Sequence, residues 1–235
     1  YRLNFTRNIA AKLSVNYARI GGADSLSGIA TQRARNLSFR TDIIEASLVA
    51  EYYFFTMNNL SRSSRPRIDF GSYIFAGGGV ALFYPYAQYD NIWYYLRPLQ
   101  TEGVDNAYDV MTVAVPLGAG ATFTFDKKIK LGIEFGYRFT FTDYLDDIST
   151  RYAFEEDLPF QESILLANRS DEAYARGEAD LPGRGFFVSG SRRGNPEKND
   201  GYIIGQICLS YNIESKRQKA LYRKQIYRRR KRTKF

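Results

Sequence analysis

Apolar and polar residues alternate along seven segments of the chain, a pattern typical of β-strands whose two faces meet different surroundings. In the clearest segment, LGIEFGYRFT, Leu131, Ile133 and Phe135 share one face, and Glu134 and Arg138 share the other. The seven segments are residues 1–6, 9–20, 43–55, 70–84, 108–125, 129–141 and 202–213. Tyrosine and phenylalanine are abundant in the chain and favour pleated surfaces, so we predict an all-β protein.

The connectors between these segments alternate in length. The shorter ones are residues 7–8, 56–68 and 126–128, and the long ones are residues 21–42, 85–107 and 142–201. In a simple antiparallel order, all the shorter connectors fall at one end of the strands and all the long ones at the other. This arrangement is typical of an up-and-down barrel in an outer membrane, with short periplasmic turns and long extracellular loops.

The number of strands needs one addition. Single-chain bacterial barrels close with an even number of strands, and seven are visible here. The chain opens directly on a strand pattern, YRLNFTRN, without the charged and apolar regions of a signal peptide. We therefore expect one more strand upstream of Tyr1. Eight strands enclose a space that side chains just fill, so we predict a plugged barrel and no pore.

Alternation alone does not decide which face is outside, because a soluble lipocalin-like barrel has an apolar interior and a membrane barrel a polar one. Two features favour the membrane barrel. The polar face combines small residues with charges of both signs, and aromatic residues gather at strand ends, as in YYFF at residues 52–55. The polar residues predicted to face the lumen are Lys12, Ser14, Asn16, Glu45, Ser47, Glu51, Glu134, Arg138, Gln206 and Ser210.

Composition excludes several chemistries. The chain has no histidine, which rules out Ser-His-Asp and Cys-His nucleophiles and zinc sites with histidine ligands. Its single cysteine, Cys208, allows no internal disulfide. The glycine run at residues 77–79 lacks the GK[ST] ending of a phosphate loop and lies in a strand pattern, where glycine permits close packing or curvature. We predict no cofactor.

Positive charge is concentrated at the end of the chain. Residues 216–234 contain 11 Lys and Arg and no acid, whereas the whole chain has a net charge of +8, so the remainder is mildly acidic. We divide the chain into a barrel, residues 1–214, and a basic tail, residues 215–235. In the barrel topology the tail lies in the periplasm, where we expect no nucleic acid. An acidic protein surface, anionic lipid or no fixed partner are the open alternatives.

Three acids, Asp143, Asp146 and Asp147, follow the strand at residues 129–141. Closely spaced carboxylates suit calcium, but this segment lacks the glycine turn and terminal glutamate of an EF-hand. An acid/base pair would need a pocket that the sequence does not identify. The third interpretation, a polar strand end whose acids are solvated or pair with loop arginines, is the one that we prefer. We therefore predict neither a catalytic nor a metal-binding role.

Four ordered motifs resemble the PorG family, an outer-membrane component of the type IX secretion system of Bacteroidota. The first is RNLSFRTDIIEASLVAEYYFF at residues 35–55, and the second is YIFAGGGVALFYPYA at residues 73–87, with PLQTEG at 98–103 in its loop. The third is FGYRFTFTDYLDDIST at residues 135–150, which includes Asp143, Tyr144, Asp146 and Asp147. The fourth is RRGNPEKNDGY at residues 192–202.

The resemblance implies an eight-stranded barrel in the outer membrane and association with a periplasmic ring built from a PorK-type lipoprotein and a PorN-type partner. We therefore predict a non-enzymatic component that anchors or positions a secretion machine, with its basic tail in the periplasm. The alternative is a soluble, lipocalin-like carrier of a small ligand. The candidate partner-binding residues are Arg62, Arg65, Arg67, Arg223, Lys224, Arg228, Arg229 and Arg230.

Overall fold

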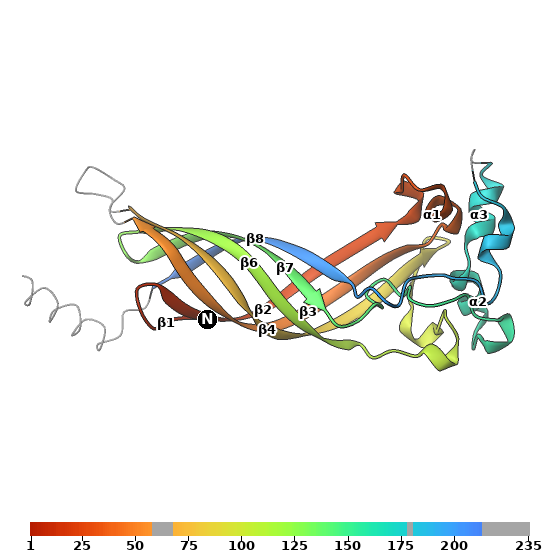
Figure 1. The fold of residues 1–235 in the computed structure, drawn as a ribbon, viewed down its shortest axis with the longest axis horizontal. Helices are drawn as coiled ribbons and strands as arrows, with labels where there is room; N and C mark the ends of the chain where they lie inside the picture. The colour runs from red at the N-terminus through yellow and green to blue at the C-terminus, as the bar shows by residue number, and fades with distance from the viewer. Residues whose placement is uncertain (58–67, 178–180, 213–235) are drawn as a thin grey trace, which may run out of the picture. The chain divides into compact units, whose positions relative to one another are not determined.

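The computed structural model describes residues 1–57, 68–177 and 181–212, and their fold is an antiparallel β-sheet with few helices (Figure 1). The strands are β1 (Arg2–Asn4), β2 (Ile9–Ala23), β3 (Ser38–Met57), β4 (Ile68–Tyr89), β5 (Ile92–Tyr95), β6 (Met111–Phe125), β7 (Ile129–Thr140) and β8 (Gly201–Tyr211). The order in the sheet is β1-β2-β3-β4-β6-β7-β8, and β5 pairs with β4. Strands that follow one another in sequence are therefore neighbours, which is the topology of an up-and-down barrel. In the described residues the sheet ends at β1 and β8 and is not closed.

All seven predicted strands are confirmed, and one hairpin was missed. The sequence pattern ended the fourth strand at Tyr84 because a proline follows, but β4 continues through Pro85 to Tyr89. Proline lacks only the backbone N–H donor. Its carbonyl oxygen still accepts a hydrogen bond from Leu96 N at 2.9 Å. Asp90 and Asn91 then adopt left-handed conformations, φ 48° and 61°, as a two-residue type I′ turn requires, and β5 follows.

The chain divides into two compact units. Unit 1 comprises Tyr1–Tyr52, Phe75–Gly118 and Gly136–Ile204, and unit 2 comprises the described parts of Tyr53–Ile74, Ala119–Phe135 and Gly205–Phe235. The helices α1 (Ala30–Arg35), α2 (Gln161–Ala167) and α3 (Ser170–Ala175) belong to unit 1, where α1 contacts α3 (Figure 1). None of the helices in the described ranges is both long and apolar enough to cross a membrane.

In unit 1 the charged face of the strands is the buried one. β2 and β3 pair in a register that joins Ser14 to Ser47 and Asn16 to Glu45. Glu45, which is 1% exposed, accepts hydrogen bonds from Ser47 at 2.8 Å and from Tyr202 at 2.8 Å, and forms an ion pair with Arg138 at 3.3 Å. The opposite face exposes large apolar side chains to the surroundings, among them Leu13, Val15, Ile44, Leu48, Phe139 and Ile203.

Unit 2 repeats this inversion. Glu134 is 2% exposed and accepts hydrogen bonds from Tyr73 OH and Gln206 Nε2, both at 2.5 Å. Lys130 donates to Tyr53 OH at 2.8 Å. On the opposite face of β7, and on the outward face of β8, large apolar side chains are exposed. They include Leu131, Ile133, Phe135, Ile207, Leu209 and Tyr211.

Two of the three consecutive glycines in β4 allow the backbone of β3 to approach closely. A Cβ atom on Gly77 would collide with Leu48 O, and one on Gly79 would lie 2.5 Å from Ala46 O. A Cβ atom on Gly78, which points outward, would meet nothing within 4 Å. The close packing expected for this run is therefore confirmed at Gly77 and Gly79.

Candidate functional site

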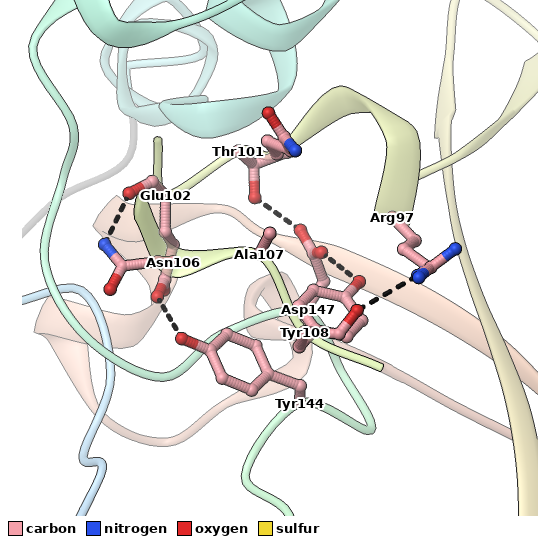
Figure 2. Close-up of a pocket in the computed structure, with 9 residues that line it drawn as sticks. Arg97, Thr101, Glu102, Asn106, Ala107, Tyr108, Tyr144 and Asp147 are labelled. Carbon is pink, nitrogen blue, oxygen red and sulfur yellow. Dashed lines mark hydrogen bonds between the residues drawn. The ribbon is translucent and has the colours of Figure 1, made fainter. Parts of the chain in front are cut away.

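Two long connections of unit 1 meet at a buried polar cluster, which we call the loop cluster, formed by Glu102, Asp147 and Arg193 (Figure 2 draws the first two). Glu102 comes from the connection after β5, Asp147 from the segment after β7, and Arg193 from the segment before β8. Their exposed fractions are 5%, 1% and 4%. Charged groups are this deeply buried only when they are paired, so the cluster depends on its internal contacts.

Glu102 uses both carboxylate oxygens. Oε1 accepts hydrogen bonds from Arg193 Nη1 at 3.0 Å and from Ser149 N at 2.8 Å. Oε2 accepts from Thr150 N at 2.8 Å and from Thr150 Oγ1 at 2.6 Å. The Glu102 carboxylate thus accepts hydrogen bonds from the backbone N–H groups of residues 149 and 150, as a neighbouring strand would in a sheet. These two residues lie just after the three acids found in the sequence.

Asp147 is held from the opposite side. Thr101 Oγ1 and Tyr108 OH donate to its two carboxylate oxygens, each at 2.5 Å (Figure 2), and Arg193 Nη1 donates to its backbone oxygen at 2.5 Å. Burial raises the pKa of Asp147 to about 6, against the opposing effects of Arg193, Thr101 and Tyr108. Burial also raises the pKa of Tyr108, and the neighbouring charge of Asp147 adds to this effect. Tyr108 therefore stays a donor at every physiological pH.

Further contacts connect the loop cluster to the start of β3. Arg35, at the end of α1, donates to Arg193 O at 2.7 Å and forms an ion pair with Asp24 at 2.7 Å. Thr41 Oγ1 in β3 donates to Leu145 O at 2.5 Å, and Leu145 N donates to Asp200 Oδ2 at 3.0 Å. All the long connections of unit 1 are thereby joined through hydrogen bonds that start or end on charged side chains.

The geometry of the loop cluster is that of a structural staple. The side chains that line the pocket drawn in Figure 2 pack closely and leave about 0 Å³ of space for water between them. Each oxygen of the two carboxylates already accepts at least one hydrogen bond, so both side chains are held in fixed positions. Among the described residues, no group of three or more His, Cys, Asp and Glu side chains is arranged to hold a metal ion.

Beside the loop cluster lies an open cleft of about 570 Å³, lined by Asp143, Asp146, Asp200, Arg35 and Phe186 among others. Burial raises the pKa of Asp146 to about 8, and the neighbouring charge of Asp200 acts in the same direction. Burial likewise raises the pKa of Asp143 to about 6 and shifts the pKa of Asp200 upward. Arg193 and Arg35 oppose the shift at Asp146. The negative charge of Asp146 would thus be only partly balanced by the neighbouring arginines.

The other predicted site residues are placed as follows. Glu45, Ser47, Glu51, Glu134 and Arg138 are buried. Lys12, Ser14, Asn16 and Gln206 are half-buried, whereas Ser210 is exposed. Arg62, Arg65, Arg67, Arg223, Lys224, Arg228, Arg229 and Arg230 lie outside the described residues.

The sequence did not single out Glu102 or Arg193 as partners of the acids, although both lie in the quoted motifs PLQTEG and RRGNPEKNDGY. The four motifs of unusual composition were the available signal, because their charged residues are the ones that meet. Which acid pairs with which arginine is not visible in the chain, since 91 residues separate Glu102 from Arg193.

We predict that Arg193→Met loosens the loops while Arg192→Met does not. Arg193 is 4% exposed and its removal leaves Glu102 and Asp147 buried without their cation, which costs about 3–5 kcal/mol. Arg192 is exposed, and within the described ranges its side chain donates to Gly194 O alone, so its loss should cost less than about 0.5 kcal/mol. Hydrogen exchange at residues 142–152 measures the difference. Equal protection in the two variants would contradict the assignment of the loop cluster as a staple.

We also predict that unit 1 becomes less stable as pH rises. Folded Asp146 keeps its proton up to about pH 8, whereas the unfolded chain releases it near 3.8, so the folded state binds more protons between these values. The free energy of unfolding should fall by up to about 1.4 kcal/mol per pH unit in this window. Asp146→Asn removes that part of the slope, as urea titrations at pH 5, 7 and 9 measure. The same pH dependence in both proteins would refute the prediction.

A protein-family model matches the chain. The family model described as "Domain of unknown function (DUF6089)" matches residues 1–162, which are more than half of the chain. No curated protein and no solved structure matches the chain. The match covers β1 to β7 and two of the three partners in the loop cluster, Glu102 and Asp147. The chain belongs to the DUF6089 family.

Proposed function

We propose that the protein is a non-enzymatic β-barrel of the Gram-negative outer membrane that anchors or positions a periplasmic ring of a type IX secretion machine. The observation that carries the membrane part is the inversion of the strand faces. In each unit, carboxylates such as Glu45 and Glu134 are buried while large apolar side chains on the opposite face are exposed.

Moving a Leu, Ile or Phe side chain from water to an apolar environment is worth about 1.5–3 kcal/mol. Leu48, Ile133 and Ile207 are 58%, 44% and 78% exposed, and they belong to continuous outward faces of β3, β7 and β8. Exposed apolar surface of this extent marks a face that meets lipid or a partner. Alternation along antiparallel strands with a polar buried face is typical of membrane barrels.

The alternative, a soluble carrier with a lipocalin-like barrel, needs an apolar cavity for its ligand and a polar exterior. The buried face instead carries Glu45, Glu51, Glu134 and Arg138, each with polar partners in the same unit. This observation favours the membrane barrel over the carrier.

The secretion role rests on the resemblance of the four sequence motifs to the PorG family. The charged residues of these motifs form the loop cluster, so the resemblance concerns residues that maintain the fold of the extracellular loops. An anchor requires a rigid barrel and a periplasmic contact, and neither requires a catalytic group. The proposed partners are outer-membrane lipid, a PorK-type lipoprotein and a PorN-type protein. Residues 215–235 would supply the basic contact in the periplasm.

We predict that Leu48→Arg impairs folding into lipid vesicles, whereas Leu26→Arg does not. An arginine on the lipid-facing side of a barrel strand costs about 2–4 kcal/mol near the bilayer midplane. Leu26 is 87% exposed in the connection after β2, where added charge should be tolerated. Heat-modifiable gel migration in phosphatidylcholine vesicles, measured over a series of urea concentrations, reports the folded fraction. A soluble carrier would tolerate both changes equally.

A second prediction concerns the ring. From outer membranes solubilised in mild detergent, the intact chain should co-purify a periplasmic ring lipoprotein, and a chain truncated after Glu214 should lose it. A variant with Arg223, Lys224, Arg228, Arg229 and Arg230 changed to glutamine controls for charge and should lose it as well. Retention of the ring by both variants would exclude the tail as the contact, and absence of the ring from the intact protein would contradict the secretion role.

A further inference from the structure

Arg40, near the start of β3, has an unusual environment. Its guanidinium carbon lies 3.9 Å from the centre of the Trp93 ring and 5.3 Å from the centre of the Tyr86 ring. Its Nε atom is buried without a hydrogen-bond partner among the described residues. Aromatic rings therefore hold the group in place without supplying acceptors for its donors.

The nearby acid does not neutralise this cation. Asp42 lies close enough to feel the charge of Arg40, but its carboxylate is already occupied. Arg19 binds both of its oxygens, at 2.5 Å and 3.2 Å, and Tyr17 OH donates to it at 2.9 Å. Within the described part of the chain, Arg40 forms no ion pair. It retains a positive charge and two terminal nitrogen atoms with unused donors.

The position of Arg40 on the sheet indicates what it faces. By strand alternation, Arg40 shares the outward face of β3 with Ile44 and Leu48 and lies four residues beyond Ile44 toward the loops, about 14 Å along the strand. Tyr86 belongs to the outward face of β4 and pairs with Tyr95 of β5, at 5.3 Å between ring centres. Aromatic residues at the end of an apolar face are typical of the interface between lipid tails and head groups.

We propose that Arg40, held against Trp93 and Tyr86, binds the phosphate group of an anionic lipid in the outer leaflet. This inference rests on the proposed membrane function. A guanidinium binds phosphate through parallel hydrogen bonds from one edge while its flat faces stay against aromatic rings. A cation with unused donors at the depth of the head groups meets such phosphates directly, and the phosphate oxygens supply the acceptors that the protein does not.

The sequence provides a reporter for this site, because Trp93 is the single tryptophan of the chain. The full chain in dodecyl maltoside is titrated with three probes, namely lipid A with its phosphates, lipid A with the phosphates removed, and inorganic phosphate. We expect the phosphorylated lipid to change the emission of Trp93 and to bind at least about tenfold more tightly than the other two. Equal binding of inorganic phosphate, or of the dephosphorylated lipid, would overturn the proposal.

Two variants test the role of Arg40. Arg40→Gln should abolish the preference for phosphorylated lipid. Arg184→Gln is the matched control, because Arg184 also lies over a ring, that of Tyr174 at 4.8 Å, but is already paired with Asp171 at 2.7 Å. It should leave the preference unchanged. Arg40→Lys keeps the charge and serves if the glutamine variant does not fold, and it should weaken the preference several-fold. An unchanged preference in a folded Arg40 variant would refute the assignment.

Failure of this inference differs from failure of the proposed function. Heat-modifiable migration in vesicles tests insertion and does not depend on Arg40. If the chain inserts and Trp93 does not respond to lipid phosphate, the phosphate site alone is wrong. If the chain does not insert, the membrane function fails and the phosphate site fails with it.

Discussion

A carboxylate that stays ionised when it is buried has to be paired, and this requirement links the strands and the loops of this protein. A charge removed from water is tolerated only with partners that replace its hydration. On the strands, Arg138, Ser47 and Tyr202 are the partners of Glu45. In the loops, Arg193 lies between Glu102 and Asp147. The contacts of Glu45 with Arg138 and Tyr202, and those of Arg193, link segments distant in sequence, so the same contacts pair the charges and hold these segments together. Small residues on the same buried face leave room for these side chains.

The same arrangement explains the exposed apolar face. Once the charged side of each strand is buried, alternation turns the apolar side outward, because successive side chains point to opposite faces. An apolar face of this extent suits the bilayer of the proposed function. Arg40 lies at the loop end of the outward face with unused donors, and there we propose a contact with the phosphates of lipid head groups.

Much of the fold follows from the sequence, and the loop cluster does not. Period-two alternation located all seven predicted strands, since burial repeats with the pleat. The β5 hairpin was missed because Pro85 interrupted the pattern and IWYY does not alternate, although Asp90-Asn91 is a recognisable turn pair. The sequence after β7 shows the three acids but not the residues with which they pair. Glu102 and Arg193 reach them only after the long connections fold back, and such contacts leave no local periodicity.

The central claim is that the outward faces meet lipid. The most direct measurement places a nitroxide label at each position from 131 to 137 in turn, in a Cys208→Ser background, after reconstitution into vesicles. Collision rates with oxygen, which concentrates in lipid, and with a water-soluble nickel chelate are then compared. The account predicts high oxygen accessibility at Leu131, Ile133, Phe135 and Tyr137 and low accessibility to both reagents between them. High accessibility of these four positions to the nickel chelate would contradict it.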